Sequence, residues 1–268
     1  MPLLATREAV ERVKRLELPW NHLGVDPYGA TQDELARMFT LLGLLYRRYF
    51  RVSVAGLDNV PARGRAMLIG NHSGGWALDA LMVLASVFYD KEPPRLAHGM
   101  AEKFLIKLPF ISRMTQATGQ LVGLPEHAVR LLADERLLMV FPEGARGTAK
   151  LFHERNTLVK FGTGFMRLAM EMKTPIIPFG FVGGGDAVPT VFNLYKVGKL
   201  LGVPYIPVTP YLLPVPKPVA MRLEYGEPMV FEGTGNEDDE VIAGHVEKVV
   251  DTISVLIARG VESQGGRS

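Results

Sequence analysis

Residues 66–79 read Ala-Met-Leu-Ile-Gly-Asn-His-Ser-Gly-Gly-Trp-Ala-Leu-Asp, and this segment is the most informative one for predicting the fold. Its apolar beginning, 66–69, predicts a buried strand, and residues 76–89 have the composition of a helix. A short turn that contains Gly74 and Gly75 joins the two segments. A strand that leads into a helix in this way is typical of an α/β domain.

The same alternation of strands and helices continues along the chain. Short apolar runs predict further strands at 51–55, 95–98, 137–141, 175–182 and 221–225. Helical spacing of apolar residues predicts helices at 125–136, 156–173 and 236–259. We therefore expect an α/β fold in which helices flank a mixed, mainly parallel central sheet.

The chain divides into three parts. We expect an N-terminal helical segment over residues 1–50, the α/β domain over 51–260, and a disordered tail over 261–268. In the first part, Thr31 and Glu34 form a capping-box pattern, which predicts the start of a helix. The apolar side of this helix faces either the protein core or a membrane surface.

The composition of the 268-residue chain excludes several classes of protein. Its net charge of +2 lacks the strong basic excess of a nucleic-acid-binding protein. The absence of cysteine excludes disulfides, thiolate nucleophiles and cysteine-based metal sites. Charged residues interrupt the N-terminus where a signal peptide would be apolar, and no apolar run reaches the roughly 18 residues that span a bilayer. We expect a cytoplasmic protein, soluble or peripherally associated with the membrane.

His72 is the first candidate catalytic residue. It follows the predicted strand 66–69, at the carboxyl end where open α/β sheets bind ligands. Imidazole is well suited to remove a proton from a hydroxyl group, and a carboxylate such as Asp79 can orient it. Six residues separate the two, and on one continuous helix they would lie roughly 10 Å apart. A turn at Gly74 and Gly75 can return His72 toward Asp79. The alternative is a loop histidine beside a carboxylate that caps the helix.

A second polar motif, Phe-Pro-Glu-Gly-Ala-Arg-Gly-Thr at 141–148, follows another predicted strand. Arg146 can grip a phosphate group with two parallel hydrogen bonds, and Glu143 can accept hydrogen bonds from a hydroxyl group. The alternative is an ordinary turn with an ion pair at the surface. Because His72 and Glu143 each follow a core strand, coincidence is a poor explanation for the pair.

Residues 183–218 form an apolar segment that is rich in proline and begins with three glycines. Loops of this length are uncommon unless they have a function. We interpret the segment as a lid or a membrane-docking insert. The alternative is a loop that packs against the core of the protein itself.

Together these motifs resemble the glycerol-phosphate and lysophospholipid acyltransferase (PlsC-like) superfamily. The hallmark of that superfamily is Asn-His followed by Asp, then Phe-Pro-Glu-Gly with an Arg, as seen here at 71–79 and 141–146. Weaker blocks at 101–123 and 174–178 stand in the same order, so that the resemblance covers roughly residues 51–182. The usual spacing between His and Asp is four residues. The six found here resemble the diacylglycerol acyltransferase-like branch, and no Arg follows Gly119 in the middle block.

The resemblance implies an enzyme that moves a fatty acyl group to a hydroxyl group of a glycerolipid or lysophospholipid. The acyl donor would be acyl-CoA or an acyl carrier protein, the other partners would be the lipid acceptor and a membrane surface, and no cofactor, metal or nucleic acid is implied. It makes His72 the general base and Asp79 its partner. The residues it implies for substrate binding are Asn71, Glu143, Gly144, Arg146 and Lys103.

Two other functions remain compatible with these residues. One is hydrolysis of lipid esters or thioesters by the same His72, and the other is lipid binding without catalysis. A nucleophilic Ser73 is disfavoured because no Gly-x-Ser-x-Gly turn surrounds it.

Overall fold

A computed structural model of the chain describes residues 5–74, 77–102, 112, 115, 117–212 and 215–265. The helices are α1 (Arg7–Lys14), α2 (Gln32–Leu44), α3 (Leu78–Tyr89), α5 (Pro125–Ala133), α6 (Ala145–Thr148), α7 (Gly164–Glu171), α8 (Gly184–Ala187), α9 (Tyr195–Leu200) and α10 (Asp239–Gly265). Single turns of other helix types are η1 (Leu45–Tyr49), η2 (Leu57–Asn59) and η4 (Phe152–Glu154). The strands are β1 (Ser53–Ala55), β2 (Ala66–Gly70), β3 (Ala97–Ala101), β4 (Leu121–Val122), β5 (Leu137–Val140), β6 (Ile176–Val182), β7 (Phe192–Asn193), β8 (Pro207–Val208) and β9 (Arg222–Tyr225).

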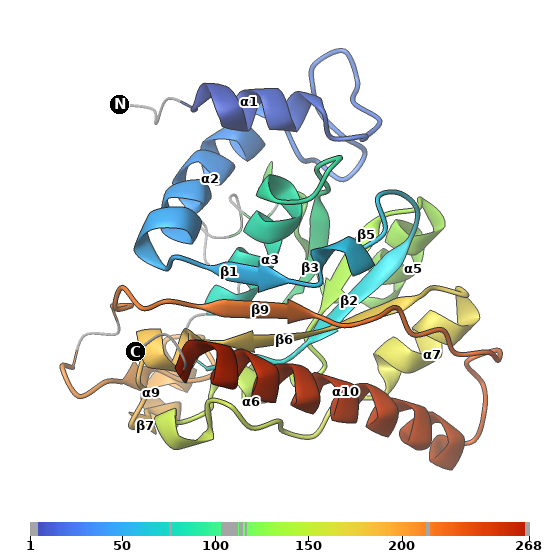
Figure 1. Cartoon of the computed structure of the whole chain (residues 1–268). Helices are drawn as coiled ribbons and strands as arrows, with labels where there is room; N and C mark the ends of the chain where they lie inside the picture. The colour runs from blue at the N-terminus through green and yellow to red at the C-terminus, as the bar shows by residue number, and fades with distance from the viewer. Residues whose placement is uncertain are drawn as a thin grey trace.

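The central sheet is mixed and mainly parallel, as predicted. Its strand order is β1-β9-β6-β2-β5-β3-β4. Strands β6, β2, β5, β3 and β4 run parallel to one another, whereas β9 runs antiparallel to β6 and parallel to β1. The carboxyl ends of β2, β5 and β6 therefore meet at one edge, which lies on the left in Figure 1 because the arrow of β9 points to the right.

Helices cover both faces of the sheet (Figure 1). Alternate residues of β2 belong to different apolar clusters, because successive side chains of a strand point to opposite faces. Ala66 and Leu68 pack with α1, α2 and α3, whereas Met67 and Ile69 pack with α5, α7 and α10. All of these β2 residues are buried, which explains why the strand reads as a continuous apolar run.

The N-terminal helix α2 is core-facing, one of the two interpretations that its sequence allowed. The side chain of Thr31 accepts a hydrogen bond from the backbone N–H of Glu34 at 3.2 Å, as the capping pattern predicts. Phe39 of α2 stacks on Phe88 of α3, with ring centroids 3.6 Å apart. No helix in the described part of the chain is both long enough and apolar enough to cross a bilayer.

Two predicted boundaries differ from the structure by more than three residues. Helix α7 begins at Gly164, not at residue 156. The chain before it is tied down elsewhere, because the Arg155 side chain pairs with Asp186 at 2.9 Å. Helix α10 continues to Gly265, although we expected a disordered tail from residue 261. The Gln264 side chain donates a hydrogen bond to the carbonyl oxygen of Ala220 at 3.0 Å, which holds the last turn against the sheet.

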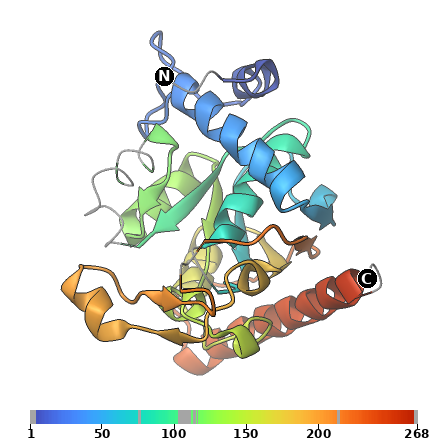
Figure 2. The same ribbon diagram turned by 90° about the vertical axis from the view of Figure 1, so that its left-hand side faces the viewer.

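The segment 183–218 contains a small hairpin. Residues 190–217, called the β7–β8 extension below, comprise β7, α9 and β8 with their connecting loops. Strands β7 and β8 pair antiparallel with each other and are separate from the central sheet. Figure 2 shows the extension as an orange segment that projects from the body of the molecule.

Candidate functional site

His72 and Asp79 are in direct contact, as the turn between them predicted. The Nδ1 atom of His72 lies 3.0 Å from Oδ1 of Asp79. Oδ1 also accepts the backbone N–H of Ala80 at 2.8 Å, and Oδ2 accepts the N–H of Ser73 at 2.9 Å. Asp79 is fully buried, and these hydrogen bonds satisfy the carboxylate and hold it in one orientation.

Both described residues that flank the gap in this turn have positive φ angles. Gly74 has a φ of +89° and Ala77, just before α3, has a φ of +49°. The chain therefore does not enter a helix directly after His72, which is why seven positions along the sequence do not become 10 Å in space. Gly75, the other glycine of the predicted turn, lies outside the described residues.

The imidazole ring of His72 is held on a second side by an aromatic ring. Phe141 stacks on it with centroids 4.1 Å apart and planes inclined by 8°. Phe141 in turn meets Phe179 edge-on at 5.6 Å. Since Nδ1 faces Asp79, the other ring nitrogen, Nε2, is the one that can meet a substrate. The sequence offered no signal for this role of Phe141 beyond its place after a strand.

Asn71 is fully buried and directed toward the sheet. Its side-chain amide donates to the carbonyl oxygen of Phe181 at 3.0 Å and accepts the N–H of the same residue at 2.8 Å. The side chain thereby continues the pairing of β2 with β6 beyond Gly70, where the backbone leaves the sheet. This arrangement fixes the start of the segment that carries His72.

Glu143 lies beside His72 and forms a buried ion pair that we did not predict. The Nζ atom of Lys150 is 2.5 Å from Oε2 of Glu143 and donates to the backbone carbonyl of His72 at 2.6 Å. Burial raises the pKa of Glu143 above its ordinary value and lowers that of Lys150, while their mutual attraction opposes both shifts. Lys150 thus connects the two motifs, although in the sequence it is one lysine among many.

Gly147 explains how closely the two motifs approach each other. A Cβ atom built at this glycine would lie 2.6 Å from Oε2 of Glu143 and 2.8 Å from Cβ of His72. Only a residue without a side chain fits between them. The register of the sheet accounts for this proximity, since β2 and β5 are adjacent parallel strands in which Ile69 pairs with Val140.

The remaining predicted site residues lie around this centre. Gly144 has a φ of +57° and a ψ of −152°, a combination that favours glycine, and it begins α6. Arg146, on α6, is exposed and donates to the carbonyl oxygen of Lys160 at 3.1 Å. Lys103 lies outside the described residues.

Ser73 has an environment that does not suit a nucleophile. Its side chain is fully buried and lies against Gly184, where an added Cβ would come within 2.1 Å of the hydroxyl oxygen. That hydroxyl has no hydrogen-bond partner among the described residues. The neighbouring histidine, His72, already has its Nδ1 atom paired with Asp79.

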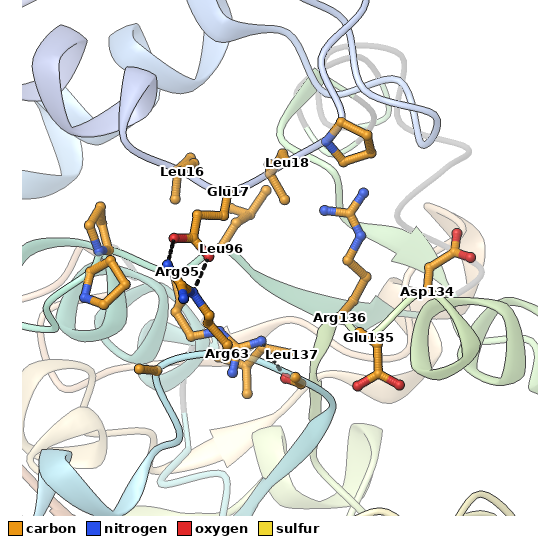
Figure 3. A pocket seen from close by; sticks show the side chains of 15 residues that line it. Leu16, Glu17, Leu18, Arg63, Arg95, Leu96, Asp134, Glu135, Arg136 and Leu137 are labelled. Atoms are coloured by element: carbon orange, nitrogen blue, oxygen red, sulfur yellow. Dashed lines mark hydrogen bonds and ion pairs between the residues drawn. The ribbon is translucent and has the colours of Figure 1, made fainter.

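A cavity of about 460 Å³ lies at the opposite edge of the sheet. It is lined by residues that precede β3 and β5, so that it lies at the amino ends of the strands. Figure 3 shows Glu17 bridged to Arg63 in this cavity, with Arg95 and Arg136 nearby. Arg95 donates to the carbonyl oxygens of Pro61 and Gly64. None of the predicted site residues lines the cavity, and its arginines hold loops together.

Comparisons with known proteins relate the chain to acyltransferases. Residues 51–182 match the family model described as Acyltransferase. Over 250 residues the chain is 32% identical to an uncharacterized protein of Mycobacterium leprae (strain TN), covering 89% of this chain and 67% of that protein. Over 216 residues it is 26% identical to the "DGAT1/2-independent enzyme synthesizing storage lipids" of Gallus gallus, covering 79% of this chain and 60% of that protein.

A solved structure has a similar fold. The crystal structure of the 1-acyl-sn-glycerophosphate (LPA) acyltransferase PlsC from Thermotoga maritima superimposes with a TM-score of 0.56 at 18% sequence identity. The match covers 84% of this chain and 82% of that one. By length, the chain spans 64% to 67% of the mycobacterial proteins that it matches and 60% of the chicken protein.

Proposed function

This chain belongs to the acyltransferase family, and from that premise we propose that it esterifies a hydroxyl group of a glycerolipid or lysophospholipid. The acyl group comes from a thioester, acyl-CoA or an acyl carrier protein. The observation that carries this proposal is the buried contact between Nδ1 of His72 and Asp79, which leaves Nε2 of the ring for the substrate.

In the proposed reaction, Asp79 accepts the Nδ1–H of His72 and so holds the tautomer in which Nε2 is unprotonated. Nε2 takes the proton of the acceptor hydroxyl group as its oxygen bonds to the thioester carbonyl carbon. The carbon–sulfur bond then breaks, and the thiolate leaves with the proton returned from Nε2. No covalent bond to the enzyme is formed, and no metal takes part.

The carbonyl oxygen gains negative charge in this step and needs hydrogen-bond donors. We assign that role to the backbone N–H of Gly74, two residues after His72 in the sequence. Asn71 acts as a positioning residue, because both groups of its amide are used by Phe181. We propose that Asn71 affects the rate through His72 and does not touch the acceptor.

Arg146 and Glu143 differ in what they can offer an acceptor. Arg146 is exposed at the edge of the site. Among the described residues it donates one hydrogen bond, to Lys160, whereas a guanidinium has five donors, so that others can bind a phosphate group. Glu143 is buried and paired with Lys150, so its role is to hold that side of the site together. We expect Arg146→Gln to raise KM for a phosphate-bearing acceptor several-fold and to leave KM for a neutral glycerolipid unchanged. Equal KM values for both acceptors would remove Arg146 from head-group binding.

The enzyme would act on lipids at the cytoplasmic surface of a membrane without spanning it. The proposed acceptor is a lipid that carries an acyl chain of its own, so it resides in a bilayer.

The test is acyl transfer by purified protein from acyl-CoA to a panel of lysophospholipids and acylglycerols, with separation of the lipid products. We expect His72→Ala and Asp79→Asn to lower kcat by on the order of 10²–10⁴-fold. His22→Ala, which changes an exposed histidine in an N-terminal loop, is the matched control and should retain full activity. Unchanged turnover in His72→Ala would sink the proposal. Release of free fatty acid without any acylated acceptor would instead identify a hydrolase.

A further inference from the structure

The β7–β8 extension exposes an unusual amount of apolar surface. More than half of the large apolar side chains exposed in the described part of the chain belong to it. Leu200 is 85% exposed, Leu212 77% and Leu201 60%. Phe192, Tyr195 and Val197 of the same hairpin are also exposed. Several exposed apolar side chains on one short segment indicate a contact with another apolar phase or molecule.

The charge of the extension has one sign. Residues 190–217 contain three lysines, Lys196, Lys199 and Lys217, and no acidic residue. The extension thus carries a formal charge of +3, whereas the entire chain carries only +2. All three lysines are exposed, and two of them lie on α9 among the exposed apolar side chains. Lysine beside exposed leucine and aromatic residues is the composition of a segment that lies in the interface of a bilayer.

One face of α9 is covered by the returning chain of the hairpin. Gly198, in the middle of α9, packs directly on the backbone of Tyr205, where an added Cβ would lie 2.6 Å from its Cα. One face of α9 is therefore occupied by the returning chain. Leu194 completes the hairpin, since its N–H donates to the carbonyl oxygen of Ile206 at 2.9 Å.

The extension is also attached to the segment that carries the candidate site. The Asn193 side chain donates to the carbonyl oxygen of Ala149 at 2.7 Å, one residue before Lys150. The N–H of Phe152 donates to the carbonyl oxygen of Thr190 at 2.8 Å. In Figure 1 the extension lies at the left, at the edge where the strands that precede His72 and Glu143 end. Figure 2 looks onto this edge and shows the extension beside it.

We infer that the β7–β8 extension docks the protein on the surface of an anionic lipid bilayer. Its leucines enter the acyl region and its lysines bind the negatively charged head groups. The charge argues against a second copy of this chain as the occupant, because two extensions would each bring three positive charges to the contact. This inference rests on the proposed function only for its purpose, which is to hold the candidate site next to lipid substrates.

The test is co-sedimentation of the full chain with vesicles of phosphatidylcholine, with and without phosphatidylglycerol, at low and high salt. The wild-type protein should bind mainly the vesicles that contain phosphatidylglycerol, and added salt should weaken that binding. Leu200→Ser with Leu201→Ser should lower the partition coefficient about tenfold or more. Lys196→Gln with Lys199→Gln should lower it about fivefold per lysine on anionic vesicles only.

Val241→Ser with Val255→Ser is the matched control, because it removes two exposed apolar side chains from α10 and should not alter binding. The inference would be overturned if the wild-type protein bound neither kind of vesicle, or if the leucine variant bound like the wild type. A leucine variant that changes only the oligomeric state would point to a second copy and would also overturn it.

Acyl transfer separates this inference from the proposed function. The leucine variant should keep the wild-type rate on a short-chain acceptor dissolved in water and lose at least tenfold on an acceptor embedded in anionic vesicles. Protein that binds vesicles but transfers no acyl group would refute the function and leave the docking surface in place. Equal rates of the leucine variant and the wild type on both acceptors would refute the docking surface alone.

Discussion

At the scale of single residues, Lys150 determines how the two motifs of the candidate site are combined. It binds the carboxylate of Glu143 and the carbonyl oxygen of His72, and its side chain is almost entirely buried. A buried charge is stable only when it is paired, so that each partner depends on the other. Asp79 is different, because backbone N–H groups donate two of the three hydrogen bonds that it forms with described residues. His72 is therefore fixed at its ring by Asp79 and at its backbone by Lys150.

The first prediction concerns this ion pair. Lys150→Met should lower the free energy of unfolding by about 3–5 kcal/mol, because it leaves the Glu143 carboxylate buried without a counter-charge. Combining it with Glu143→Gln should recover part of that loss, because no unpaired charge then remains. Urea unfolding of the two single variants and the double variant measures the coupling. Losses that simply add would contradict an interaction between the two side chains.

At the scale of elements, the turn between β2 and α3 gives the site its geometry. A strand followed at once by a helix would separate His72 from Asp79, and the left-handed residues Gly74 and Ala77 delay the helix. The carboxylate then lies in the first turn of α3, where the helix dipole favours a negative charge. Gly74 also lies close to Lys150. A Cβ atom added at Gly74 would be 3.4 Å from the carbonyl oxygen of Lys150.

The second prediction tests this turn. Gly74→Ala should cost roughly 1–2 kcal/mol of stability, because alanine is strained at positive φ. It should also lower kcat by about tenfold or more, because small displacements of a catalytic group are costly. Gly64→Ala is the matched control, since Gly64 has a φ of +79° but lies at the opposite edge of the sheet. It should show the same loss of stability with wild-type kcat. A fall in kcat for both variants would mean that strain alone, and not the turn, is responsible.

At the scale of the whole molecule, the two faces of the sheet are covered by helices that approach it closely. Helix α10 crosses β6 at Gly180, where a Cβ would lie 2.7 Å from the backbone nitrogen of Ile257. His98 lies on β3, three strands away from β6 in the sheet, and is completely buried. Its Nδ1 lies 2.7 Å from the carbonyl oxygen of Gly119, and its Nε2 has no hydrogen-bond partner among the described residues. The fold therefore holds this histidine in its neutral form.

The third prediction is that His98 makes the fold less stable in acid. Burial, with help from the positive charges of Arg136 and Arg95, lowers the pKa of His98 from 6.5 to about 4. Between these values the unfolded chain binds a proton that the folded chain does not, so stability falls as the pH falls through this window. The shift corresponds to roughly 3 kcal/mol. This contribution to the free energy of unfolding should be fully lost only near pH 4.

Urea unfolding over this pH range provides the measurement. His98→Gln should lose less stability than the wild type between neutral pH and pH 4, because glutamine does not titrate. His22→Gln, at an exposed position, should follow the wild-type curve and serves as the control. Parallel curves for His98→Gln and the wild type would show that His98 does not contribute.

Local sequence is enough to predict the strands of the sheet core and the order of the two motifs. Buried strands such as 66–70 and 176–182 are apolar throughout, and this local property can be read without knowledge of the neighbours. The same locality limits the prediction of boundaries. Local sequence predicts a helix over residues 156–163, which the structure does not form. It also predicts a tail where the last turn of α10 is held by a contact with Ala220, which is distant in sequence.

The contacts between side chains that are distant in sequence follow from the tertiary structure alone. Asn71 binds Phe181 across 110 positions of sequence, and Lys150 binds the carbonyl oxygen of His72 across 78. Such contacts depend on the order of strands in the sheet, which the periodicity of one segment does not encode. The same reason applies to the β7–β8 extension: its apolar residues could have packed inward or faced outward, and only its position on the folded chain left them exposed. The sequence determined the chemistry that is present, and the packing of distant segments determined where it is placed.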